Sequence, residues 1–305
     1  LAVNAGGYLA VVAVAVVGIS LPFYLSGVLA FFGGLAAAGL VLALSQGGSA
    51  GPTRLILAGA ATTLALSAVT SVLLVLFQQQ TTGLFAWGSG SVVQSGTRVV
   101  TLAAPVVLVG LLGLALLARR LDLLALGDDA ARVLGVDVRG TRVLTVGVAV
   151  LLSAAAVTVA GPIGFVGLCA PVLARLVART VPGLSRHTTL LPLSALFGIV
   201  VVLGADVLLR LVLPGQYGAA VPTGIVTTVF GALTLVLLAR RLRDSGPAAK
   251  GAAAHVRPRT ARRTVVVVTV LGVLLVVAAV LAVLLGDRML LLGDVSNWFA
   301  DQAGR

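Results

Sequence analysis

The chain has 305 residues, of which 59% are hydrophobic and 10% are charged, and it carries a formal net charge of +12. One soluble core could not bury so much apolar side chain, so the composition excludes an ordinary soluble protein and predicts an all-α, polytopic membrane helix bundle. The positive charge could indicate nucleic-acid binding, but the basic residues lie in short loops between apolar runs, and no nucleic-acid partner is expected.

Nine apolar runs are predicted to be membrane spans, because about 18 to 23 helical residues cross about 30 Å of hydrocarbon. In chain order they lie at 2–19, 23–44, 55–77, 99–118, 143–160, 163–179, 189–209, 221–239 and 264–285. The fifth and sixth belong to one apolar stretch that is interrupted at AGPIGF, residues 160–165. Gly161 followed by Pro162 predicts a turn there, with a new helix beginning after it.

The basic residues predict the orientation of these spans. If the first span runs from the cytoplasm outward, 17 Lys and Arg residues fall on the cytoplasmic side and 4 fall outside. Cytoplasmic loops of membrane proteins carry this excess of positive charge. We therefore expect a multi-pass membrane protein, surrounded by membrane lipid, with residues 125–142 facing the cytoplasm.

The cytoplasmic segment ALGDDAARVLGVDVRGTR, residues 125–142, holds three of the nine acidic residues of the chain. Asp128 and Asp129 follow Gly127, where acids in the first turn of a helix complement its dipole, and Gly135 is expected to end that helix. A helix this short and polar cannot cross the bilayer and is expected to lie along its surface. The residues alone leave two interpretations open, a solvated connector and a contact site for a partner.

A pair of opposite charges is expected near the outer end of the seventh span. Asp206 and Arg210 are spaced i, i+4, which favours a structural ion pair that shields two charges over a contact with substrate. No spacing of His, Cys, Asp or Glu indicates a metal site, and none is expected.

The two ends of the chain suggest a fragment of a longer protein. It starts with Leu1 inside a span and stops at Arg305, soon after the ninth span. Residues 244–263 are rich in Arg, Ala, Gly and Pro and are predicted to be a basic cytoplasmic linker. Residues 264–305 are then expected to supply the first transmembrane helix and an outside segment of a second membrane unit.

Seven motifs in order resemble the FecCD-type permease family of iron-siderophore, haem and vitamin B12 ABC importers. They are LAVNAGGYLA (1–10), RLILAGAA (54–61), AWGSGS (86–91), LALGDDAARVLGV (124–136), AGPIGFVGLCAPVLARL (160–176), GADVLLR (204–210) and VPTGIVTTVFGA (221–232). The chain departs from the family pattern at Val172, where the family usually has His, and at Leu233, where it usually has Pro. The resemblance covers residues 1–243 and implies a permease unit that lacks its first two helices, so that about eight transmembrane helices remain.

The resemblance also implies roles for particular residues. The acidic segment would be the docking site for a cytoplasmic ABC ATPase, formed by Gly127, Asp128, Asp129, Ala130, Leu134 and Gly135. The translocation pathway would be lined near Thr62, Ser67, Thr223 and Thr227. A bulky residue at Gly127, or Lys at either aspartate, is expected to disturb docking with little effect on stability.

The function expected from this resemblance is that of a transmembrane permease subunit of an ATP-driven importer in the bacterial plasma (inner) membrane. Ferric siderophores are favoured over haem and cobalamin as cargo. Such a permease is not an enzyme and binds no cofactor directly, since ATP is used by the partner ATPase. The other expected partners are an extracytoplasmic solute-binding protein and a second permease unit in the same polypeptide. The alternative is an ion- or proton-coupled secondary transporter, which usually places acids or His deep in its spans, whereas this chain has no Glu and only Asp206 in such a position.

Overall fold

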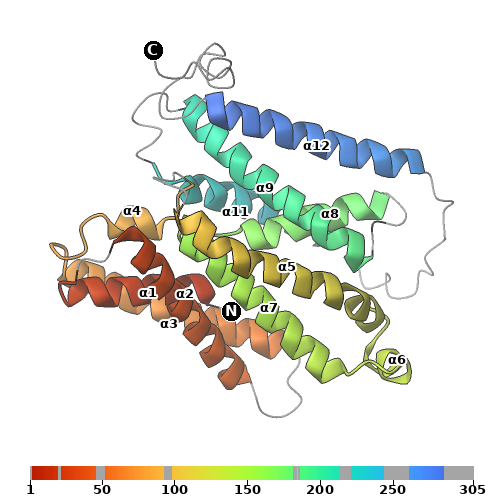
Figure 1. Cartoon of the computed structure of the whole chain (residues 1–305), viewed down its shortest axis with the longest axis horizontal. Coiled ribbons are helices and arrows are strands. Elements are labelled where there is room, and N and C mark those ends of the chain that lie inside the picture. Colours follow the sequence, from red (N-terminus) through yellow and green to blue (C-terminus); the bar gives the residue numbers. More distant parts are fainter. Residues whose placement is uncertain are drawn as a thin grey trace. The chain divides into compact units, whose positions relative to one another are not determined.

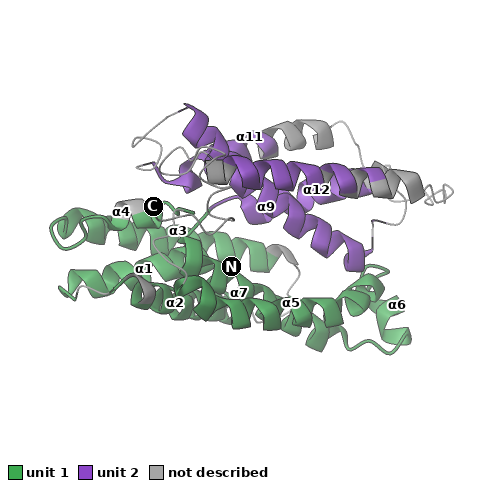
Figure 2. Ribbon diagram, turned by 45° about the horizontal axis from the view of Figure 1, so that its top comes forward, with its two compact units in different colours: residues 1–163 green, residues 164–305 purple. Residues whose placement is uncertain are grey.

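The computed structural model describes residues 2–19, 22–45, 52–92, 98–180, 184, 186–212, 221–243 and 261–284. These residues divide into two compact units, residues 1–163 and 164–305 (Figure 2). The first unit contains α1 (Val3–Val16), α2 (Phe23–Ser45), α3 (Pro52–Leu76), α4 (Leu84–Gly88), α5 (Arg98–Leu124), α6 (Asp128–Val133) and α7 (Val138–Ala160). The second contains α8 (Val166–Thr180), α9 (His187–Val212), α11 (Thr223–Arg243) and α12 (Ala261–Leu284) (Figure 1).

The all-α prediction is confirmed, because the described residues form helices and no strand. Within these described ranges, five helical segments are long and apolar enough to span a membrane: Leu25–Ser45, Arg54–Leu76, Arg98–Leu124, Val138–Ala160 and His187–Val212. The other four predicted spans coincide with shorter apolar helices, at Val3–Val16, Val166–Ala178, Thr223–Thr234 and Gly272–Leu281. Most of the predicted linker (244–260) and the predicted outside segment (285–305) lie outside the described residues, so the three-part domain organisation stays a prediction.

Helices α1 and α2 pack closely because glycines remove side chains from their contact. A Cβ atom on Gly33 of α2 would lie 2.6 Å from the carbonyl oxygen of Gly6 of α1, and one on Gly7 would lie 2.9 Å from the carbonyl oxygen of Ala30. Membrane helices have little hydrophobic drive to associate, so such small residues stabilise the pair by close van der Waals packing.

Helix α7 occupies the packed centre of the first unit, where it contacts α1, α2 and α5. Its buried Val150 and Ala154 form a core cluster with Val3 and Ala38. Nearer its end, the hydroxyl of Thr158 donates to the carbonyl oxygen of Gly27 on α2 at 3.0 Å. A displacement of α7 is therefore transmitted to several helices of this unit.

The predicted break after α7 is confirmed. Gly161 has φ +69° and follows the last residue of the helix, and its N–H donates to the carbonyl oxygen of Val157 at 2.9 Å. The carbonyl oxygen of Ile163 accepts from the side-chain amide of Asn4 at 3.1 Å. Because residues 161–165 form this turn, α8 begins at Val166, three residues later than the predicted span at 163.

The second unit is built on the contact between α8 and α9. Its core cluster consists of Ala174, Ala178, Leu184, Leu190 and Leu193. Helix α11 contacts both α8 and α9, and α12 packs against α9.

Candidate functional site

The polar segment between α5 and α7 forms the predicted short helix, α6. Asp128 and Asp129 occupy its first turn, and the helix ends at Val133 with Leu134 as its C-cap. Gly135 follows with φ +80°, and the N–H of Val136 donates to the carbonyl oxygen of Ala131 at 3.0 Å. This left-handed glycine with a backward hydrogen bond is a common way to end a helix. The predicted end at Gly135 is therefore confirmed.

Two glycines with positive φ delimit α6. Gly127 has φ +106° and ψ +156°, a conformation open almost only to glycine, although no atom lies within 4 Å of a Cβ built there. The sequence-based expectation that a bulky residue at Gly127 would change only the docking surface is therefore wrong in one respect. Any side chain at Gly127 strains the backbone, even though there is space for the side chain itself.

Gly127→Ala should consequently loosen α6. The strain of a non-glycine residue in this region is about 1–3 kcal/mol, so we expect amide hydrogens of residues 128–134 to exchange about tenfold faster or more. Gly147→Ala is the matched control, because Gly147 lies inside helix α7 with no atom within 4 Å of its missing Cβ. Hydrogen exchange measured by mass spectrometry checks this, and equal protection in both variants would contradict the strain argument.

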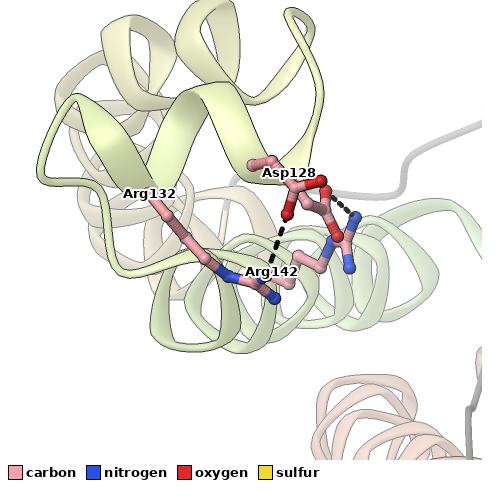
Figure 3. Close-up of polar contacts among 4 residues, drawn as sticks. Asp128, Arg132 and Arg142 are labelled. Atoms are coloured by element: carbon pink, nitrogen blue, oxygen red, sulfur yellow. Dashed lines mark hydrogen bonds and ion pairs between the residues drawn. The ribbon is translucent and has the colours of Figure 1, made fainter.

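The two acidic side chains of α6 form ion pairs with different partners (Figure 3). Asp129 Oδ1 lies 3.2 Å from Arg132 Nη1 within the same helix, and its side chain is 98% exposed. Asp128 Oδ1 accepts from Arg142 Nη2 at 2.7 Å, and Arg142 belongs to α7. One carboxylate thus joins α6 to a long apolar helix, while the other faces solvent. Arg142 was not among the predicted site residues, because its contact spans 14 residues and two helices.

Exposed apolar side chains surround these charges. Val133 is 87% exposed, Leu126 is 66% exposed and Leu134 is 56% exposed, whereas Ala131 is fully buried against the rest of the unit. Asp137 caps α7 directly after this segment, since its Oδ1 accepts from the N–H of Gly140 at 3.0 Å. The arrangement offers a small surface with apolar contacts and an accessible carboxylate, held by one buried alanine and one cross-helix ion pair.

The predicted pair of Asp206 and Arg210 is present on α9. Arg210 Nε donates to Asp206 Oδ2 at 2.8 Å, and the side chains are 15% and 8% exposed, respectively. The second oxygen, Asp206 Oδ1, accepts from the hydroxyl of Thr223 on α11 at 3.1 Å. Three residues therefore form one buried polar cluster that joins α9 to α11.

The residues predicted to line a pathway differ in exposure. Thr62, Thr223 and Thr227 are buried, and Ser67 is exposed. The hydroxyl of Thr227 donates to the carbonyl oxygen of Gly224 at 3.0 Å, within its own helix. Their role in translocation stays a prediction. In the described part of the chain, no group of three or more His, Cys, Asp or Glu residues could hold a metal ion.

The described residues thus form an all-α membrane protein with a short polar helix between two of its candidate spans. The model of the FecCD transport family matches residues 1–241, and the chain belongs to this family. It is thus a permease component of an ABC importer and a multi-pass protein of the plasma membrane.

Individual relatives agree with this assignment. The Fe(3+)-citrate import system permease YfmD of Bacillus subtilis is 36% identical over 243 residues, which cover 79% of this chain and 70% of the relative. The hemin transport system permease HmuU of Yersinia pestis is 36% identical over 251 residues, which cover 80% of this chain and 72% of that relative. A solved structure of a metal-chelate type ABC transporter in an inward-facing conformation aligns with TM-score 0.67 and 26% identity, covering 78% of this chain and 74% of that one.

Proposed function

We propose that this chain carries chelated ferric iron across the plasma membrane, driven by a cytoplasmic ABC ATPase that docks on α6. The observation that carries the proposal is α6 itself, a short helix between two membrane-spanning helices with exposed Val133 and Leu134 and a fully accessible Asp129. A short helix with exposed apolar side chains at its end suits binding in a groove of a partner. Such a groove would cover the apolar side chains of Val133 and Leu134, whereas a solvated connector would leave them uncovered.

Leu134→Asp should weaken docking strongly with little effect on the fold. Loss of an apolar anchor from a small contact typically costs about 2 kcal/mol, which corresponds to roughly 30-fold weaker binding of the ATPase. An exposed substitution changes the free energy of unfolding by about 0.5 kcal/mol or less. Co-purification of the ATPase and thermal unfolding check the two effects, with the exposed Arg120→Gln at the end of α5 as control. Normal capture of the ATPase by Leu134→Asp would favour the interpretation of α6 as a solvated connector.

The permease is proposed to use no cofactor and to hydrolyse no ATP itself. Its sequence lacks the Gly-x-x-x-x-Gly-Lys-Ser/Thr motif that cradles nucleotide phosphates. A gradient-driven secondary transporter is not favoured, because Glu is absent and Asp206 is already neutralised by Arg210.

Reconstituted vesicles test the energy source and the cargo. We propose that uptake needs an extracytoplasmic solute-binding protein and a second permease unit, which we place in the same polypeptide beyond residue 243. ATP-dependent uptake of a labelled ferric siderophore, compared with ferric citrate, haem and cobalamin, would identify the cargo. Uptake by the permease alone under an imposed proton gradient would overturn the ATP-driven proposal.

A further inference from the structure

Helix α6 has six residues, which is too short for a stable orientation of its own. It is connected to the spans through two glycine joints, Gly127 with φ +106° and Gly135 with φ +80°. The buried Ala131 and the hydrogen bond from the N–H of Val136 to the carbonyl oxygen of Ala131 hold α6 close to its neighbours. A side-chain contact that crosses a joint would in addition make α6 and α7 turn together.

The ion pair between Asp128 and Arg142 crosses the second joint. Asp128 lies in the first turn of α6, and Arg142 lies in the second turn of α7, beyond Gly135. The 2.7 Å contact joins two full charges, and charge-assisted hydrogen bonds of this kind are short and directional. The side chains of Arg142 and Asp128 are 56% and 38% exposed, so the pair adds little to the stability of the fold. The short, directional contact can instead fix the orientation of α6 relative to α7.

We propose that Asp128 and Arg142 are positioning residues that make α6 move together with α7. The inference rests on the proposed docking of the ATPase at α6 and goes beyond it, because it separates two roles. Asp129, Val133 and Leu134 contact the ATPase, whereas Arg142 determines how much of its movement reaches α7. From α7 the displacement passes to α1, α2 and α5, which pack against it.

The test is made in vesicles that contain the full-length permease, the ATPase and the solute-binding protein. Arg142→Gln should leave capture of the ATPase within twofold of the parent but lower the substrate transported per ATP hydrolysed at least fivefold. Arg142→Lys keeps a cation opposite Asp128 without changing α6, and it should recover at least half of the transport per ATP that Arg142→Gln loses. Arg139→Gln removes one charge from the first turn of α7 outside the pair and should change neither quantity.

A measurement without the ATPase keeps the inference independent of docking. Spin labels at Val133→Cys and Leu144→Cys, both on exposed positions, report the distance between α6 and α7 in the permease alone. The distance distribution should broaden in Arg142→Gln and not in Arg139→Gln. An unchanged distribution, or an unchanged yield per ATP, would overturn the positioning role. An equal loss of ATPase capture and transport would instead make Arg142 a docking contact, while normal capture by Leu134→Asp would overturn the docking proposal itself.

Discussion

Replacement of Gly33 by leucine is expected to destabilise the folded chain by about 3 kcal/mol. Gly33 lies on α2, and a Cβ atom there would approach the carbonyl oxygen of Gly6 to 2.6 Å, closer than a real carbon atom approaches. The obstacle is backbone and cannot rotate away, so α1 and α2 must separate. Separation removes the close packing that holds two apolar helices together in lipid.

Gly39→Leu is the matched control for this prediction. Gly39 lies on the same helix, is exposed, and has no atom within 4 Å of its missing Cβ, so leucine fits there. Thermal unfolding of the purified protein in detergent should show a clear loss for Gly33→Leu and almost none for Gly39→Leu. Equal unfolding temperatures for the parent and both variants would show that the approach of α1 and α2 does not stabilise the bundle.

The contrast between these glycines shows what the sequence can and cannot predict about the fold. The length of apolar runs located the helices well, as for α9, which was predicted at 189–209 and extends over His187–Val212. Gly161 and Pro162 also revealed the break after α7, because their backbone preferences are local. Which glycine meets another helix depends on tertiary packing, and both Gly33 and Gly39 have only apolar neighbours in the sequence.

In the candidate site, too, the local features could be predicted from the sequence and the contacts between helices could not. The limits of α6 could be predicted from Gly127, Gly135 and the two acids, since helix ends have local signals. The pairing of Asp129 with Arg132 obeys helical spacing, but the partner of Asp128 lies on the next helix and no pattern within α6 indicates it. Sequence reasoning could therefore propose a docking helix without finding the ion pair that orients it.

The buried polar cluster on α9 and α11 could likewise be predicted only in part from the sequence. The i, i+4 spacing predicted the pair of Asp206 and Arg210, whereas Thr223 was predicted only as a pathway residue. In the structure the hydroxyl of Thr223 donates to Asp206 Oδ1 at 3.1 Å, and Thr223 is 1% exposed. Both oxygens of this buried aspartate are thus hydrogen-bonded, one to a cation and one to a hydroxyl. Such complete pairing is what allows a charge to remain buried.

Arg210→Met should therefore destabilise the chain by about 3 kcal/mol, because it leaves the carboxylate of Asp206 buried without its cation. Adding Asp206→Asn removes that charge, and the amide oxygen of asparagine can still accept from Thr223. We expect the double variant to regain most of the lost stability, as measured by thermal unfolding in detergent, and to transport at a rate near that of the parent. A double variant as unstable as Arg210→Met would contradict the buried-charge argument. A double variant that folds normally but no longer transports would show that these charges take part in transport, because a purely structural pair is replaceable by neutral side chains of similar shape.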